Sequence, residues 1–230
     1  MTVRKLEIYG DSVLRGVMYD TDRKRYTLCG TRADALNALC ERGIETKNYS
    51  RMGATVGKGL ELLTKNLPED ARGTAVLLEY GGNDCDFDWS AVSENPRGTF
   101  EPHTPRDEFL AGYRKMVDLI RARGGTPILS SLVPIDAEKY FSWISAGRKG
   151  ENILAWLGDV SMLARWQEQY SRTVERLAYE LNVPLLDFRA AFLTAHNYPA
   201  LLCADGIHPT EEGHGIINRV LERVELGIGN

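Results

Sequence analysis

The chain has 230 residues, of which 43% are apolar and 26% are charged, and this balance is ordinary for a soluble globular protein. Its 28 basic and 32 acidic residues leave a net charge of −4, so there is no basic footprint for nucleic acid. No run approaches the ~18 apolar residues that a membrane helix needs, and we expect no membrane insertion.

The predicted elements alternate between strand and helix along the chain. They are a strand at Lys5–Tyr9, a helix at Arg32–Arg42, a strand at Ile44–Tyr49, a helix at Thr55–Leu67, a strand at Thr74–Tyr80, a helix at Asp107–Arg123, a strand at Pro127–Leu132, a helix at Val160–Leu181, a strand at Pro184–Asp187 and a helix from Thr210 to Leu226. The helices rest on apolar residues at helical spacing, and Gly43, Pro68 and Gly124 mark the ends of three of them.

This alternation predicts a doubly wound α/β sheet with helices on both faces. The strand at 74–80 is apolar on both faces, as a central parallel strand covered by helices must be. No linker divides the chain, so we predict a single domain over residues 1–230. In open sheets of this type, ligands bind beyond the carboxyl ends of the strands. Ser12 and Asn83 directly follow the first and third predicted strands.

Two long stretches, 84–105 and 134–159, interrupt the alternation and are predicted to be loops. Loops longer than about 12–15 residues are uncommon unless they have a function. Both stretches leave the carboxyl ends of strands and are rich in aromatic residues. We therefore expect them to wall the active site. The alternative is that they are satellite packing layers.

The first candidate site residue is Ser12, in the run Gly10-Asp11-Ser12. A serine hydroxyl is a poor nucleophile unless a base takes its proton. Gly10 permits a tight turn between the strand and the following loop. In isolation, the same tripeptide would indicate no more than a capped helix start, with Asp11 as the cap or as the residue that holds the turn.

His208 is the candidate base, because Asp205 precedes it by three residues. One turn of chain can place this carboxylate against the imidazole, where it would fix the tautomer and stabilise the imidazolium. None of the other three histidines has an aspartate three residues before it. We expect His103 and His196 to be structural or exposed and His214 to serve packing or the surface.

Asn83 is the candidate oxyanion donor, in the run Gly81-Gly82-Asn83-Asp84. The two glycines let the backbone approach a substrate closely, and an amide of Asn83 can donate to a developing oxyanion. Gly53 follows the second predicted strand, where a further backbone donor could converge on the same point. Each motif alone would be an unremarkable turn.

Several other chemistries lack their motifs. There is no Gly-x-Ser-x-Gly elbow, no His-Glu-x-x-His zinc motif, and neither a dinucleotide fingerprint nor a phosphate-binding loop. Cys29, Cys40, Cys85 and Cys203 show no Cys-x-x-Cys spacing, which argues against a structural zinc site. The even count permits two disulfides. The start of the chain shows no apolar leader, so we predict reduced thiols and a cytoplasmic location.

In combination, these motifs resemble the SGNH hydrolases, also called the GDSL lipase/esterase family. Gly10-Asp11-Ser12 corresponds to the first block of that family, Gly53 to the second, Gly81-Gly82-Asn83-Asp84 to the third and Asp205-Gly206-Ile207-His208-Pro209 to the fifth. The stretch from Arg15 to Cys29 is less typical of the family, and we expect it to alter the mouth of the pocket.

The resemblance implies roles for the candidate residues. Ser12 would be the nucleophile, His208 the base and Asp205 its partner, with an oxyanion hole from the amides of Ser12 and Gly53 and the side chain of Asn83. It also implies a flavodoxin-like three-layer α/β/α sandwich with about five parallel strands. No metal or organic cofactor is implied.

We therefore expect a serine esterase that forms an acyl-enzyme and acts on a small-molecule ester. Aromatic residues in the two long stretches favour a carbohydrate ester or another small ester with an acetyl or short acyl group. Cleavage of a lysophospholipid or thioester is the alternative. Two rivals from other classes are a non-catalytic ligand-binding module on the same scaffold and a flavodoxin-like nucleotide binder.

Overall fold

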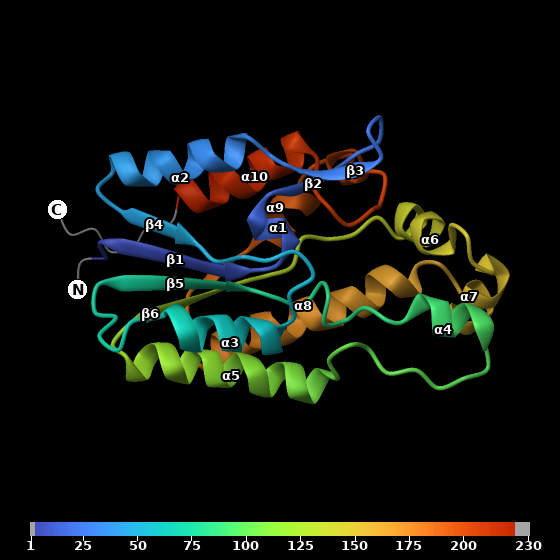
Figure 1. Ribbon diagram of the computed structural model, residues 1–230, viewed down its shortest axis with the longest axis horizontal. Coiled ribbons are helices and arrows are strands. Elements are labelled where there is room, and N and C mark those ends of the chain that lie inside the picture. The colour runs from blue at the N-terminus through green and yellow to red at the C-terminus, as the bar shows by residue number, and fades with distance from the viewer. Residues whose placement is uncertain (1–2, 224–230) are drawn as a thin grey trace.

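A computed structural model of the protein describes residues 3–223, apart from the side chains of residues 32 and 33. Its centre is a five-stranded sheet in which every pairing is parallel (Figure 1). The strands lie in the order β4 (Glu45–Asn48), β1 (Lys5–Gly10), β5 (Thr74–Glu79), β6 (Thr126–Ser130) and β7 (Leu185–Leu186). Numbered along the chain, these five strands have the spatial order 2-1-3-4-5, which is that of flavodoxin-like folds. The predicted fold class is confirmed.

Helices cover both faces of this sheet and make the outer two layers (Figure 1). One face carries α2 (Thr31–Glu41), α9 (Phe188–Leu193) and α10 (Glu211–Glu222), and the other carries α3 (Val56–Asn66), α5 (Arg106–Ala122) and α8 (Met162–Glu180). All six residues of β5 are buried. Val76 and Leu78 pack towards α3, α5 and α8, whereas Ala75 and Leu77 pack towards the other three helices. This period of two follows from the pleat of a strand.

The predicted elements are present with bounds within two residues, as far as the description extends. The last predicted helix is seen as α10, and residues 224–226 of the prediction lie outside the described residues. The agreement is good because most of these elements are long helices or the buried central strands, in which the apolar pattern is strongest, and the short strands β4 and β7 are bounded by turn residues.

The prediction of loops at 84–105 and 134–159 is wrong in part. The first stretch contains α4 (Trp89–Glu94), and the second contains α6 (Ala137–Ser145) and α7 (Gly150–Leu157). These helices have at most nine residues, too few to show a clear period. The sequence does indicate the start of two of these helices. Asp88 and Asp136 are N-cap residues, and each accepts hydrogen bonds from two amides of the following turn.

These short helices form an apolar cluster of their own beyond the carboxyl ends of the strands (Figure 1). Phe87 and Trp89 pack there with Tyr140, Ile144 and residues of α7 and α8. The same segments also line a cavity beside Ser12. The two interpretations of these stretches, a satellite layer and a wall, therefore describe one structure.

The stretch between Ser12 and Cys29 folds into elements that the periodicity did not predict. After the short helix α1 (Ser12–Arg15), strands β2 (Val17–Asp20) and β3 (Arg25–Leu28) pair in antiparallel fashion as a separate hairpin. A 3-10 helix, η1 (Tyr198–Leu201), lies before the segment that carries Asp205.

None of the helices within residues 3–223 is long and apolar enough to cross a membrane. The four cysteines carry free thiols, of which only that of Cys40 is exposed. The cytoplasmic location expected from the sequence stays a prediction.

The close packing of α3 on β5 predicts opposite outcomes for two glycines of this helix. A Cβ on Gly59 would lie 2.4 Å from the ring of Tyr80, whereas a Cβ on Gly57 would meet only the Thr55 hydroxyl oxygen, at 3.9 Å. Gly59→Ala should lower the free energy of unfolding by about 1–3 kcal/mol, because the buried ring must shift. Gly57→Ala should leave it unchanged or raise it by up to about 1 kcal/mol, because alanine favours the helix.

Urea denaturation followed by circular dichroism measures both values. A Gly59→Ala variant as stable as Gly57→Ala would contradict the packing of α3 against Tyr80.

Candidate active site

Ser12 lies directly beyond β1 and opens α1. The Asp11 side chain accepts a hydrogen bond from the Val13 amide at 2.8 Å and so caps this short helix. The backbone before Ser12 is closely packed, because a Cβ on Gly10 would lie 3.1 Å from atoms of both Leu14 and Glu79. Ser12 is only 7% exposed and lines a cavity. The turn therefore holds the hydroxyl in a protected position.

Ser12, His208 and Asp205 form one chain of hydrogen bonds. His208 Nε2 lies 2.8 Å from Ser12 Oγ, and His208 Nδ1 lies 2.6 Å from Asp205 Oδ2. Asp205 Oδ1 accepts the amides of Ile207 and His208 at 3.2 and 3.1 Å, so both carboxylate oxygens are used. All three side chains are buried. In this order the imidazole can take a proton from the serine while the carboxylate holds its other nitrogen.

The turn that carries Asp205 and His208 is fixed against α6 by Gly206. This glycine has a φ of +75°, and a Cβ on it would lie 2.5 Å from the Tyr140 nitrogen and 2.7 Å from the Asp136 carbonyl oxygen. The Gly206 carbonyl accepts the Asp136 amide at 2.9 Å. Close backbone contact thus sets the position of the imidazole, and no other residue fits here.

Asn83 lies beside Ser12 on the same cavity, and its side-chain nitrogen donates to the Ala54 carbonyl at 3.1 Å and to Asp11 Oδ2 at 3.2 Å. Gly53, with a φ of +73°, precedes Ala54 in a turn that the Arg51 amide ties to the end of β1. The structure therefore brings Ser12, Asn83, Asp205 and His208 together. It places Gly53 in the adjoining turn, outside the residues that line the cavity.

Two carboxyl groups lie next to Ser12: that of Asp11, which the sequence indicates as a cap, and that of Glu79, which the sequence analysis does not single out. The Asp11 amide donates to Glu79 Oε2 at 3.4 Å, and both side chains are buried. Burial raises the pKa of Asp11, although hydrogen bonds from Val13 and with Glu79 oppose this rise. The readable signal was the acidic Glu79 at the end of an otherwise apolar strand.

Asp84 joins α3 to the end of β5. Its carboxylate oxygens lie 3.0 and 3.1 Å from the Val56 amide at the start of that helix. Burial raises the pKa of Asp84 to about 6 despite its hydrogen bonds with Thr104 and Val56. This residue therefore supports the segment that carries Asn83 and does not touch the Ser12 hydroxyl.

Tyr26 of the β2–β3 hairpin lies over the imidazole. Its ring centroid is 5.1 Å from that of His208, at an interplanar angle of 62°. Burial, followed by the negative charge of Asp205, raises the pKa of Tyr26 to about 12. His214 of α10 contacts the hairpin, since its Nε2 lies 3.0 Å from the Val17 carbonyl oxygen. The stretch expected to alter the pocket mouth thus covers His208, and no pattern in the sequence indicated the contact.

The remaining histidines lie as expected. His214 is buried and serves packing, and His103 and His196 are exposed. His103 Nδ1 lies 3.1 Å from the Asn83 carbonyl oxygen. Within residues 3–223, no group of three or more histidine, cysteine or acidic residues is placed to hold a metal ion.

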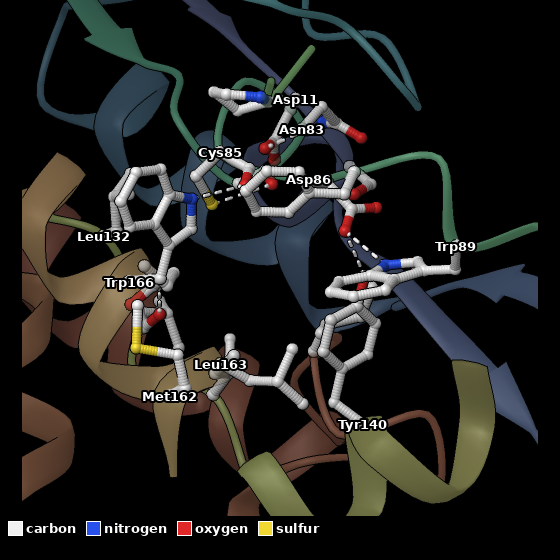
Figure 2. A pocket seen from close by; sticks show the side chains of 18 of the residues that line it. Asp11, Asn83, Cys85, Asp86, Trp89, Leu132, Tyr140, Met162, Leu163 and Trp166 are labelled. Carbon is white, nitrogen blue, oxygen red and sulfur yellow. Dashed lines mark hydrogen bonds between the residues drawn. The ribbon is translucent and has the colours of Figure 1, made fainter. Parts of the chain in front are cut away.

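A cavity of about 410 Å³ extends from Ser12 and His208 towards α4, α7 and α8. Figure 2 shows Trp166, Met162 and Leu163 on one side of it and Trp89 and Tyr140 on the opposite side. The cavity lies at the carboxyl ends of β1 and β5, where the strand order of the sheet reverses. Such a point is the usual ligand site of a doubly wound sheet.

The family model of the GDSL-like lipase/acylhydrolase family matches residues 8–216. The GDSL esterase/lipase WDL1 of Oryza sativa subsp. japonica is 23% identical over 171 residues, which cover 73% of this chain and 60% of that protein. An acetylxylan esterase of Geobacillus stearothermophilus is 39% identical over 67 residues, 28% of this chain and 30% of that protein. The chain thus spans about 60% of the length of plant relatives such as WDL1.

The fold also occurs in solved structures. A catalytic mutant of Axe2, an acetylxylan esterase from Geobacillus stearothermophilus, superposes with a TM-score of 0.66 at 23% sequence identity. The match covers 100% of this chain and 97% of that one. At this level of identity the likeness shows a shared fold, and the resemblance drawn from the motifs is confirmed by the family model.

The raised pKa of Asp84 predicts a pH-dependent difference between wild type and Asp84→Asn. On folding, this pKa rises from 3.8 to about 6, so the native state keeps a proton that the unfolded chain releases between these values. The contribution of this carboxyl group to stability therefore falls as the pH rises through this window. Relative to wild type, Asp84→Asn should gain about 2 kcal/mol in free energy of unfolding between pH 4 and pH 7. Urea denaturation at both pH values measures this, and a pH-independent difference would contradict it.

Proposed function

Because the chain belongs to the GDSL-like lipase/acylhydrolase family, we propose that it is a serine ester hydrolase that forms an acyl-enzyme on Ser12. The observation that carries the proposal is the buried chain of hydrogen bonds from Ser12 through His208 to Asp205, at 2.8 and 2.6 Å. It ends in a cavity large enough for a substrate.

In the first half of the reaction, His208 Nε2 takes the proton of Ser12 as Oγ attacks the ester carbonyl carbon. The carbonyl π electrons move to the oxygen, and a tetrahedral intermediate forms. Asp205 accepts a hydrogen bond from Nδ1–H of His208. This bond fixes the tautomer of the imidazole and stabilises the imidazolium. His208 then gives its proton to the alcohol oxygen as the C–O bond breaks, and the acyl group remains on Ser12 as an ester.

In the second half, water takes the place of the alcohol. His208 removes a proton from this water as its oxygen attacks the acyl carbon. Collapse of the second tetrahedral intermediate releases the carboxylic acid and returns the proton to Ser12. The proposed reaction uses groups of this chain and water.

The oxyanion of both intermediates is assigned to the backbone amides of Ser12 and Gly53 and the side-chain amide of Asn83. One such donor is typically worth about 3 kcal/mol of the barrier. Support comes from Asn83, which lines the cavity beside Ser12, and from its hydrogen bond to Ala54 in the turn of Gly53. Of the two hydrogen bonds that Asn83 Nδ2 makes, the one to Asp11 is the longer, at 3.2 Å, and the oxyanion would compete with it.

Two substrate classes fit this mechanism. The sequence favours an acetyl or short-chain ester of a small molecule or carbohydrate, and a relative named as an acetylxylan esterase agrees with that expectation. Lysophospholipids and thioesters, the alternative, carry longer acyl chains. The apolar walls of the cavity favour a longer chain over a sugar.

We expect Ser12→Ala to lower hydrolysis of 4-nitrophenyl acetate, butyrate and octanoate by at least about 10³-fold, because no other group can carry the acyl intermediate. Asp205→Asn should lower it by about 10²–10⁴-fold, because the amide does not hold the productive tautomer. Ser142→Ala, at an exposed serine of α6, is the matched control and should keep wild-type activity. Circular dichroism verifies the fold of each variant.

Turnover that survives in folded Ser12→Ala would overturn the mechanism. If the wild type hydrolyses no ester and a fluorophosphonate does not label Ser12, the protein is a non-catalytic binding module instead.

The contact between Tyr26 and His208 predicts a smaller effect. Tyr26→Ala should lower kcat/KM for 4-nitrophenyl acetate about fivefold, because an aromatic contact contributes about 0.5–1.5 kcal/mol beyond area burial. Tyr26→Phe keeps the ring and should retain most of the activity. Tyr179→Ala, at a tyrosine that is 89% exposed, is the control. Equal rates for Tyr26→Ala and wild type would show that the hairpin does not position the imidazole.

A further inference from the structure

The walls of the cavity beside Ser12 are mostly apolar and aromatic. Phe87 and Trp89 of the first long stretch, Trp156 of α7, and Leu163 and Trp166 of α8 all line it. At about 410 Å³ it lies within the range of pockets that enclose a whole small ligand, about 300–1,000 Å³. An acetyl group has two carbons and would leave most of this space empty.

Most of the aromatic rings of this wall pack on one another edge to face, and Phe87 and Trp166 are tilted at 39°. The centroid of Phe87 is 5.0 Å from that of Trp156 and 5.6 Å from that of Trp89, at interplanar angles of 70° and 61°. Phe100 meets Trp156 at 78°. A sugar-binding platform presents a flat ring face to its ligand, whereas these rings interlock into a continuous apolar wall.

Several polar groups of the wall are already hydrogen-bonded within the protein. Asp86 Oδ1 accepts Trp89 Nε1 at 2.7 Å and the Tyr140 hydroxyl at 2.6 Å, as the dashed lines in Figure 2 show. Trp166 Nε1 donates to the Cys85 carbonyl at 2.9 Å. A sugar hydroxyl that entered this wall would lose its water without gaining these groups as partners.

The charges around the cavity exclude an anionic ligand. Asp11, Glu79, Asp86 and Glu101 line it, and among its lining residues only His208 can carry a positive charge. A phosphate or carboxylate inside the cavity would lie among acidic side chains, without a lysine or arginine among the lining residues to balance its charge.

We infer that this cavity binds the acyl half of the ester, as a neutral, apolar chain of medium length. The inference rests on the proposed function and names the substrate class of that same site. The acyl group stays on Ser12 through both halves of the reaction and needs an enclosing pocket. The alcohol must leave and water must replace it, so the open side of the site belongs to the alcohol.

The chain-length profile of the wild type tests this inference. Each methylene buried in the pocket should raise kcat/KM about fourfold, because burial of a CH₂ group contributes about 0.8 kcal/mol. With 4-nitrophenyl esters from acetate to dodecanoate, kcat/KM should reach its maximum between hexanoate and decanoate, at least tenfold above acetate. A maximum at acetate, or a higher kcat/KM for tetra-acetyl xylose than for the octanoate ester, would overturn it.

Two isomeric esters distinguish the acyl from the alcohol half of the substrate. Ethyl octanoate and octyl acetate have the same atoms and nearly the same hydrophobicity. The inference requires a higher kcat/KM for ethyl octanoate, and preference for octyl acetate would assign the cavity to the alcohol instead.

A matched pair of variants on α7 tests where the acyl chain of the substrate lies. Leu157 lines the cavity, whereas Leu154, three residues earlier, is 39% exposed and lies outside it. Leu157→Trp should lower kcat/KM for the octanoate ester at least tenfold and that for acetate by a much smaller factor, since the indole takes up cavity space that the longer acyl group needs. Leu154→Trp should change neither.

Equal octanoate activity in folded Leu157→Trp and Leu154→Trp would show that the acyl chain does not bind next to Leu157. Failure of the inference differs visibly from failure of the proposed function. In the first case acetate is still hydrolysed and Ser12 is still labelled by a fluorophosphonate, whereas in the second case neither occurs.

Discussion

The hydrogen bond between His208 Nε2 and Ser12 Oγ is the contact that the rest of the site depends on. It joins residues that are 196 positions apart in the chain, at a separation of 2.8 Å. Such a distance is kept only if both partners are attached to rigid elements. Ser12 follows a central strand of the sheet, and His208 follows a glycine turn packed on α6. Loss of either attachment would leave a serine without a base.

The topology of the sheet explains why this contact occurs at this edge. Strands β1 and β5 are hydrogen-bonded neighbours, although they are first and third among the strands of the main sheet along the chain. Their following segments leave on opposite faces, so a gap opens between them at the carboxyl ends. Ser12 and Asn83 lie on its two sides. The same reversal places the cavity next to Ser12.

Buried carboxyl groups hold this edge together. Asp11, Glu79 and Asp84 come from the ends of β1 and β5, and each has hydrogen-bonding partners at the site. A buried charge is costly unless it is paired in this way. These groups connect the turn of Ser12, the start of α3 and the segment of Asn83. Ser12 and Asn83 therefore lie on a network of buried polar groups.

The cavity beside Ser12 is built mostly from a different part of the chain. The sheet positions Ser12 and Asn83, whereas α4, α6, α7, the start of α8 and the loops before α4 and α6 supply most of the apolar wall. These helices pack into a cluster separate from the two that cover the sheet. Residues such as Leu157 can therefore change the shape of the cavity without disturbing the Ser12–His208 contact.

The sequence by itself determined the long elements, the fold class and the identity of the candidate residues. Periodic burial and strand ends are local properties, and the spacing of Asp205 and His208 within one turn is local as well. Only the tertiary structure decided that Tyr26 covers His208, that α4, α6 and α7 are helical, and that their rings enclose a cavity. Short helices and a hairpin gain their stability from contacts with distant segments, and those contacts leave no period in the sequence.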